Sequence, residues 1–288
     1  MRQGLILFPK STLGNGSNAF GWWCDEAASL GISLQIAFFE DIILRYGTEH
    51  SAHIGTGIPA SPDFVIMRGY SENISTHFER AGIPVFNRWN AMAASHNKLR
   101  THSILAHSGI PTPLTISASR ASYEDACTLL GKDVFVVKQP DSSRGRNVFL
   151  VRNKKEYDLA AASCRGEFLI QEYISASHGR DLRVWTVGDS AVACVLRHSA
   201  SSFLSNYSCG GSADPFDAPQ AALDLAARAA RAVGLDFAGV DLLFTADGNF
   251  TVCEVNGNAG FRTLSAVGGK NIIAIFMKHI ASKVYGEY

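Results

Sequence analysis

The sequence has 288 residues, of which 47% are hydrophobic, and its 26 Lys and Arg balance 26 Asp and Glu. This length predicts two or three lobes, since domains commonly hold about 100–200 residues. The formal net charge of +0 argues against nucleic acid or an anionic membrane as a partner, because both favour a basic excess.

The first part of the chain alternates short apolar runs with an amphipathic stretch. Apolar residues at helical spacing predict a helix from Ser17 to Leu30 that ends at Gly31. Apolar runs predict strands over residues 4–8, 32–38, 64–68 and 84–87. Strands that alternate with helices are typical of a parallel sheet, so residues 1–93 are predicted to form a small parallel α/β domain.

The remaining residues are predicted to form a central domain over 94–175 and a C-terminal domain over 176–288. Periodicity and cap residues predict helices over 95–107, 154–163, 217–233 and 270–284. Apolar runs predict strands over 134–138, 147–151 and 167–174, and hairpins over 181–197 and 237–255. The predicted fold class is therefore α/β, with antiparallel α+β regions.

The cysteines and the N-terminal run bear on the compartment. The six cysteines include no C-x-x-C pair, which predicts free thiols in a reducing compartment rather than disulfides or a zinc site. The apolar run LILF is too short for a signal-peptide core or a membrane span. We therefore expect a cytoplasmic protein without a membrane segment.

Two acids and an amide are expected to meet on one face of the second hairpin. If Asp247-Gly248 forms a two-residue turn, Asp241 and Glu254 lie opposite each other, with Cβ atoms roughly 5 Å apart. Asn256 follows Glu254 by two residues and so shares its face.

Such a group is costly unless a cation compensates it. All-oxygen ligands suit a hard divalent ion, and Mg²⁺ is commonly held by one or two carboxylates together with substrate phosphates. Apolar Leu243 and Val252 are expected on the same face, which argues against full solvation. The alternative is a hairpin face whose polar residues point at water.

Lys138 ends an apolar run, and the polar loop QPDSSRGR follows it at once. A lysine at a strand end beside backbone donors suits an anionic phosphate chain. Taken singly, however, both Lys138 and Lys98 are interpreted as solvated surface lysines.

The register of the first hairpin is open. Asp181 and Arg183 share a face, and a two-residue turn at Gly188-Asp189 puts Arg197 on the opposite face. One extra loop residue brings Arg197 opposite Asp181 instead, because a slip of one residue reverses every side chain.

In this order the segments resemble the ATP-grasp ligases, and within them the branch that contains the ribosomal-protein glutamate ligase RimK. The resemblance extends from residue 86 onward, about two-thirds of the chain, and implies an ATP-grasp fold preceded by the small α/β lobe. It rests on FNRWNAMAASHNKLRTHSILAHSGIPTPLT, FVVKQPDSSRGRNVFLV, FLIQEYISASHGRDLRVWTVGD, FLSNYSCGGSA, AGVDLLF and VCEVNGNAG.

The resemblance implies a role for each matching residue. Two lysines would reach the phosphates, namely Lys98 and Lys138. The hinge that holds adenine would be Gln171, Glu172, Tyr173 and Ile174, with Asp181 on the ribose side. The γ-phosphate and acyl-phosphate site would be lined by Arg183, Arg197, Ser205 and Asn206, the two arginines being catalytic. The metal ligands would be Asp241, Glu254 and Asn256, with Glu254 bridging two ions.

The implied activity is ATP-dependent joining of a carboxylate to an amine through an acyl phosphate, with release of ADP. The implied cofactors are ATP and Mg²⁺, as two ions, with Mn²⁺ as an alternative. The partners would be a small-molecule or peptide carboxylate and an amine acceptor, amino acids among them, and a homo-oligomer is left open. Basic residues near the site suit either an acidic partner such as glutamate or the phosphates themselves, namely Arg183, Arg262 and Lys270.

The sequence departs from the family pattern at two places. The loop SSRGR is poorer in glycine than is usual, so Arg144 or Arg146 would replace part of its backbone contact with phosphate. The stretch NAGFRT stands where ribosomal-protein modifiers read something like SPGLEG, so their substrate is not carried over.

Two other functions are weighed against the ligase. A small-molecule kinase would transfer phosphate to a hydroxyl, and a nucleotide-binding module would have lost catalysis. Turnover of ATP that needs both a carboxylate and an amine separates the ligase from the kinase. The complete set of Asp241, Glu254 and Asn256 argues against the non-catalytic module.

Overall fold

The computed structural model describes residues 2–13, 19–57, 60–143, 145–200, 202–205, 211–261, 264, 267 and 271–286. The chain divides into two compact units. Unit 1 contains Met1–Ala93, Gly234–Phe237 and Asn271–Tyr288, and unit 2 contains Ala94–Val233 and Ala238–Lys270. In the described part of the chain, no helix is long and apolar enough to cross a membrane.

Unit 1 is built on a four-stranded sheet of order β2-β1-β5-β6 whose strands are all parallel, as predicted. The strands are β1 (Arg2–Phe8), β2 (Ile32–Phe38), β5 (Phe64–Met67) and β6 (Val85–Phe86). A separate antiparallel hairpin pairs β3 (Ile42–Arg45) with β4 (Ser51–Ile54). The helical segments are η1 (Lys10–Thr12), α1 (Ala19–Ser29), η2 (Phe39–Asp41), α2 (Glu72–Arg80) and α9 (Ile272–Tyr285).

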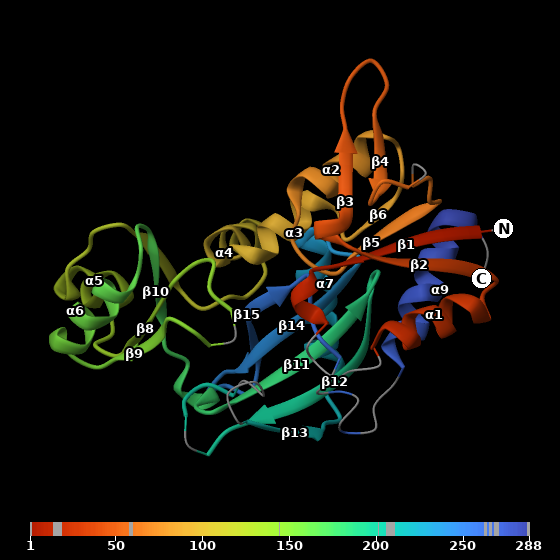
Figure 1. Ribbon diagram of the computed structural model, residues 1–288. Helices are drawn as coiled ribbons and strands as arrows, with labels where there is room; N and C mark the ends of the chain where they lie inside the picture. The colour runs from red at the N-terminus through yellow and green to blue at the C-terminus, as the bar shows by residue number, and fades with distance from the viewer. Residues whose placement is uncertain are drawn as a thin grey trace. The chain divides into compact units, whose positions relative to one another are not determined.

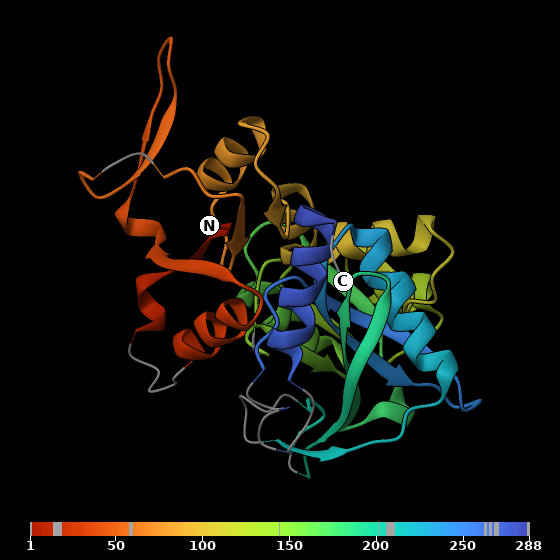
Figure 2. The same cartoon turned by 90° about the vertical axis from the view of Figure 1, so that its right-hand side faces the viewer.

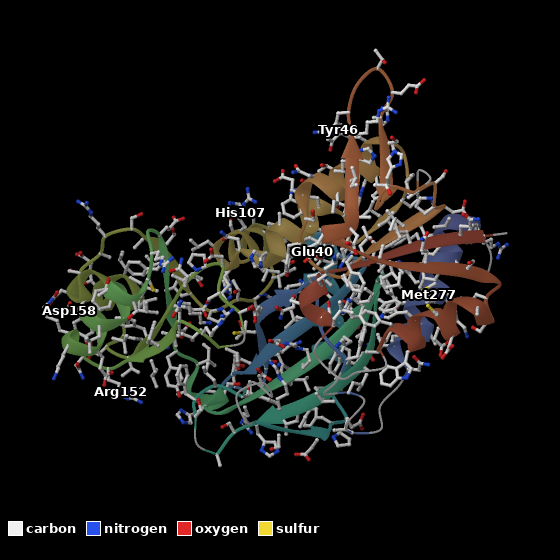
Figure 3. All side chains as sticks on the ribbon, viewed as in Figure 1. Glu40, Tyr46, His107, Arg152, Asp158 and Met277 are labelled. Atoms are coloured by element: carbon white, nitrogen blue, oxygen red, sulfur yellow. The ribbon has the colours of Figure 1, made fainter. Side chains whose placement is uncertain are left out.

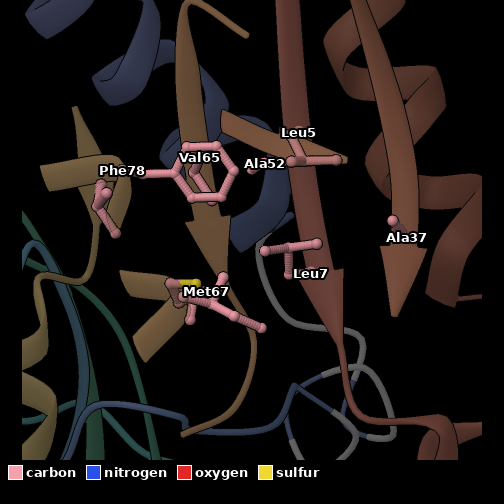
Figure 4. Close-up of a cluster of buried hydrophobic side chains, with 9 residues drawn as sticks. Leu5, Leu7, Ala37, Ala52, Val65, Met67 and Phe78 are labelled. Atoms are coloured by element: carbon pink, nitrogen blue, oxygen red, sulfur yellow. The ribbon is translucent and has the colours of Figure 1, made fainter. Parts of the chain in front are cut away.

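The core of unit 1 lies between this sheet and the segments that cover it. Leu5 and Leu7 of β1 pack with Val65 and Met67 of β5 and with Phe78 of α2, and each of these side chains is at most 2% exposed (Figure 4). Strands in the middle of a parallel sheet are buried on both faces, which is why LILF and FVIM read as unbroken apolar runs. The β3–β4 hairpin was not predicted; its strands, IILR and SAHI, are only four residues long and largely half-buried or exposed.

Unit 2 contains two antiparallel sheets. The first has the order β7-β10-β8-β9, with β7 (Thr115–Ala118), β10 (Phe168–Glu172), β8 (Phe135–Lys138) and β9 (Val148–Val151). Its apolar core is closed by two helices, α5 (Tyr123–Leu130) and α6 (Lys154–Ser163). The short 3₁₀ turn η3 (Ser175–Ser177) follows β10.

The second sheet has the order β13-β12-β11-β14-β15. Its strands are β11 (Arg180–Val187), β12 (Ser190–His198), β13 (Ser212–Pro215), β14 (Phe237–Phe244) and β15 (Phe250–Asn256). Helix α7 (Gln220–Val233) packs along one face through buried Ala222, Leu225, Ala226 and Ala229 (Figures 1 and 2). The opposite face is left for polar side chains.

The helix predicted over residues 95–107 is two helices. Helix α3 (Trp89–His96) ends before Asn97, and α4 (Lys98–His107) begins after it. The Asn97 side chain accepts a hydrogen bond from the backbone N–H of Arg100, which is the geometry of an N-cap. Apolar spacing alone concealed this break, and the cap places Lys98 in the first turn of α4.

The β11–β12 ladder settles the register that the sequence left open. Near the turn, Val187 pairs with Ser190, which is the register of a two-residue turn at Gly188-Asp189. The register then shifts, so that Val192 has no partner and Asp181 lies opposite Arg197. The extra residue therefore lies within the strand and not in the turn.

A second irregularity shapes the β14–β15 ladder. The pairing of Asp241 with Glu254 is confirmed, but the predicted two-residue turn is wrong. The ladder closes through Thr245–Asn249, and an extra residue, Cys253, restores the register beyond it. The prediction for Val252 is wrong for the same reason, since Val252 pairs with Leu242 on the buried face.

Candidate active site

A cavity in unit 2 is lined by residues of both sheets and of α4. Most of the predicted site residues line it: Lys98, Lys138, Gln171, Glu172, Tyr173, Ile174, Asp181, Ser205, Asp241 and Glu254. Arg183 and Arg197 stand behind this lining, and Asn206, Arg144, Arg262 and Lys270 lie outside the described residues.

Four charged side chains form a continuous buried network on the open face of the second sheet. Arg197 binds Asp181 at two points, with Nε–Oδ1 2.7 Å and Nη2–Oδ2 2.5 Å. The same Nη2 lies 3.0 Å from Asp241 Oδ2. Arg183 donates to Asp241 through Nε and through Nη2, the latter at 2.8 Å. Both arginines therefore form ion pairs with Asp241.

The network sets the protonation of its members. Burial would raise the pKa of Asp241, but Arg183 and Arg197 outweigh burial and hold that pKa below its usual value. Burial does raise the pKa of Asp181, against the opposing charge of Arg197 and a hydrogen bond from Ser205. For Arg197, burial would lower the pKa, yet the two carboxylates raise it, so the guanidinium stays charged.

Lys98 joins the first turn of α4 to the second hairpin. Its Nζ lies 3.4 Å from Glu254 Oε1 and also donates to the backbone carbonyl of Ser142 in the β8–β9 loop. The lysine is 9% exposed, so its charge faces the cavity and not bulk solvent. The interpretation of Lys98 and Lys138 as solvated surface lysines is wrong, because both are buried in the wall of one cavity.

Lys138 is the last residue of β8, and its ammonium group contacts two neighbouring side chains. Its Nζ donates to Gln171 Oε1 at 2.6 Å and lies 3.8 Å from the Cys253 thiol. The extra residue in β15 turns Cys253 toward the cavity, where burial raises the pKa of its thiol. The sequence carried no signal for this cysteine, because a bulge cannot be read from alternation.

The hinge residues separate into inward and outward side chains. Gln171 is 1% exposed and turned into the wall, so its side chain faces Lys138. Glu172 pairs with Lys132 at the rim, and the Tyr173 hydroxyl contacts His178 Nδ1. The ring of Tyr173 also packs edge-on against Phe203, 6.4 Å between centroids, at the cavity mouth.

The donor set of the second hairpin is suited to a hard divalent cation. Asp241, Glu254 and Asn256 lie on one face of neighbouring strands and offer oxygen atoms alone. Among the described residues, Asn256 Nδ2 is buried without a hydrogen-bond partner, so no protein group fixes this amide. No three His, Cys, Asp or Glu side chains are grouped for a metal within the same described part of the chain. Any ion here would rely on the amide and on the two carboxylates.

Close packing behind Arg183 gives Gly239 a role that the sequence did not indicate. A Cβ atom at this position would lie 2.6 Å from the Ala259 Cβ and 3.0 Å from Arg183 Nη1. Gly239 pairs with Asn256 in the ladder, two residues before Asp241. The missing side chain therefore leaves room for the guanidinium beside Asp241.

Comparison with known proteins gives consistent matches. Residues 95–280 match the family model of the RimK-like ATP-grasp domain. A probable alpha-L-glutamate ligase from Xanthomonas euvesicatoria pv. vesicatoria is 33% identical over 220 residues, covering 75% of this chain and 74% of the relative. One of the same name from Xylella fastidiosa is 33% identical over 221 residues, covering 75% and 73%.

Solved structures agree in fold. The ATP-grasp ligase PsnB, complexed with a phosphomimetic variant of its minimal precursor, Mg and ADP, superposes with a TM-score of 0.73 at 17% identity. That match covers 98% of this chain and 99% of PsnB. D-cycloserine synthetase DcsG gives a TM-score of 0.72 at 16% identity, with 98% and 99% covered. At such identities the likeness establishes the fold alone.

Proposed function

The chain belongs to the RimK-like ATP-grasp family and is an ATP-dependent carboxylate–amine ligase, and we propose that the cavity of unit 2 is its active site. The observation that carries the proposal is the meeting of Lys98, Lys138, Asp241 and Glu254, from four different elements, in the wall of one cavity. Chemistry that transfers a phosphoryl group requires cations and metal ligands together.

The charges of the site suit a polyphosphate. Four cations, Lys98, Lys138, Arg183 and Arg197, face three carboxylates, Asp181, Asp241 and Glu254, which leaves one net positive charge. We assign the two lysines to the phosphates, and the segment from Glu172 to Ile174 to the base. In a site shielded from water such contacts are stronger than at a surface.

We assign Mg²⁺, as two ions, to Asp241, Glu254 and Asn256, with Mn²⁺ as a substitute. A bound ion would withdraw charge from the phosphate oxygens and bring the phosphates close to the acid. Arg183 and Arg197 bind both oxygens of Asp241, so an ion at this carboxylate would compete with the two guanidinium groups. A guanidinium group displaced in this way would be free to contact the transferring phosphoryl group.

The reaction follows from these roles. A carboxylate oxygen of the acid attacks the γ-phosphorus of ATP, the bond to the bridging oxygen breaks, and ADP leaves. Arg197 and Lys138 neutralise the charge that spreads over the phosphoryl oxygens. The amine nitrogen then attacks the acyl carbon and loses a proton, the carbon–oxygen bond to phosphate breaks, and the amide and phosphate are released.

We propose an amino acid as one substrate, with glutamate as the first candidate. The support is the name of the relatives, probable alpha-L-glutamate ligase, together with the net positive charge of the site. Arg183 is paired with Asp241 and assigned to the phosphoryl group, so it is not used as support for an acidic substrate.

Trapping with hydroxylamine tests the function. The full chain is mixed with Mg·ATP, hydroxylamine and one carboxylic acid at a time, beginning with glutamate and short peptides that end in a carboxylate. We expect a hydroxamate and an equal amount of ADP, because activation of the acid precedes attack by the amine. A stable phosphate ester formed from a polyol, with no hydroxamate from any acid, would favour the kinase and contradict the ligase.

A further inference from the structure

A buried chain of polar side chains leads from Lys138 through Gln171 in the cavity wall to His102 and Thr112. His102 lies one helical turn after Lys98 on α4 and is 4% exposed. Its Nε2 is 2.9 Å from Gln171 Nε2, and its Nδ1 contacts Thr112 Oγ1. Gln171 in turn accepts from Lys138 Nζ through Oε1. The chain thus links α4 to the strand that ends in Lys138.

The hydrogen-bond directions in this chain are determined by its two ends. The Thr112 hydroxyl donates to the Val252 carbonyl at 3.1 Å, so Thr112 Oγ1 must accept from His102 Nδ1–H. His102 Nε2 is then an unprotonated acceptor. At the other end, the Lys138 ammonium can only donate, so Gln171 must present Oε1 to it and its amide N–H groups to His102.

A second hydroxyl holds the same amide. Gln171 Nε2 also donates to Thr115 Oγ1 at 2.8 Å, and that hydroxyl donates to the Pro113 carbonyl at 2.8 Å. Both hydrogens of the amide are therefore used, and each is received by an acceptor whose own proton points elsewhere. A rotated amide would turn its N–H groups toward the Lys138 ammonium and leave His102 Nε2 without a donor.

We propose that His102 is a positioning residue for ligation: its Nε2 lone pair fixes the amide of Gln171, and Gln171 Oε1 then holds the Lys138 ammonium at the cavity wall. The inference rests on the proposed function, since it takes Lys138 as a phosphate contact. Burial, together with the charges of Lys138 and Lys98, lowers the pKa of His102 to about 3, so the acceptor is present at neutral pH.

Two polar substitutions separate this role from simple packing. Glutamine can place an oxygen near the position of His102 Nε2, so His102→Gln keeps an acceptor for Gln171. Asparagine reaches only as far as Nδ1, so His102→Asn keeps the contact with Thr112 and loses the acceptor. His107, which is exposed on the same helix (Figure 3), provides the matched control His107→Asn.

The measurement is the affinity of the full chain for Mg·ATP, by displacement of fluorescent mant-ADP at neutral pH. We expect His102→Asn to weaken binding about tenfold, the range of a hydrogen bond to a charged group. His102→Gln should stay within about twofold of wild type, and His107→Asn should match it. Equal losses in His102→Asn and His102→Gln would indicate packing and would overturn the inference.

A double-variant cycle adds a second readout. If His102 acts through Lys138, His102→Asn adds no loss in a Lys138→Met background, whereas independent roles add. Wild-type affinity in Lys138→Met contradicts the proposed phosphate contact itself. A loss in Lys138→Met with none in His102→Asn overturns the present inference alone. If His102→Asn does not fold, Gln171→Met removes the acceptor for Lys138, and wild-type affinity in that variant overturns the inference.

Discussion

Arg197 lies directly opposite Asp181 across the β11–β12 ladder, and its guanidinium also reaches Asp241 on the strand beyond, at 3.0 Å. Two carboxylates held this close in a buried site would repel each other, and one would take up a proton. The shared guanidinium offsets that repulsion. Arg197 is therefore both a structural cation of the sheet and a group that can be offered to a phosphoryl oxygen.

Replacing Arg197 by lysine tests both parts of this role. One ammonium cannot copy two parallel N–H donors and reach a second carboxylate. We expect Arg197→Lys to lower the free energy of unfolding by about 1.5–3 kcal/mol and to reduce hydroxamate formation at least ~100-fold. Urea unfolding and the hydroxylamine trap measure the two effects. Arg231→Lys, at an exposed pair with Asp189, is the control and should leave both unchanged.

Glu254 is predicted to bind the metal, and Glu254→Gln separates this role from its ion pair with Lys98. The amide keeps the size of the side chain and loses its charge, so affinity for a divalent ion should fall. We expect ADP release to drop at least ~100-fold, and binding of Mn²⁺ in the presence of ADP, followed by electron paramagnetic resonance, to weaken. Unchanged Mn²⁺ binding would refute the metal assignment, and exposed Glu124→Gln on α5 is the control.

His102 predicts a pH dependence of stability. Its folded pKa of about 3 lies below the usual 6.5, so the unfolded state binds more protons between these values. The stabilisation is complete above pH ~6.5 and is lost as the pH falls toward 3, about 2 kcal/mol by pH 5. Urea unfolding at pH 7 and pH 5 should show this loss in wild type. His102→Gln should lack this part of the loss, and identical slopes would contradict the assignment.

Gly239→Ala should impair the site although no charged residue is replaced. The new methyl group would meet Ala259 and push Arg183 from Asp241. We expect at least ~10-fold lower hydroxamate formation, since small displacements of positioning groups cost rate steeply. Gly47→Ala, where a Cβ would meet only the Glu49 carbonyl at 3.6 Å, should behave as wild type. Full activity in Gly239→Ala would show that the sheet moves aside.

The sequence predicted the parallel lobe, the two hairpins and most of the cavity lining, because apolar periodicity and an ordered set of motifs identify them. It placed Asp241 opposite Glu254 through two errors that cancel, a turn taken as too short and an undetected bulge. Bulges and caps depend on local hydrogen bonds that leave no period in the sequence. Arg183 pairs with Asp241 because β11 and β14 are adjacent strands in the sheet. Alternation within one strand does not show which strand lies beside it.

His102 was within reach of sequence reasoning, since it follows Lys98 by four residues on a predicted helix and so shares its face. What could not be predicted is that its partner is Gln171, which the resemblance had assigned to adenine. A buried amide and an exposed one look alike in a sequence, and only the burial of β10 between two neighbouring strands separates them.

Val192 and Cys253 are unpaired residues, and each shifts the register of its strand by one residue. Removing either residue would shorten its strand by one residue, and every side chain beyond the deletion would move to the opposite face of the sheet. Deletion of Val192 would move Arg197 away from the face that carries the site. Deletion of Cys253 would do the same to Glu254 and Asn256. Each of these two sites would therefore tolerate exchange of its side chain but not loss of the residue.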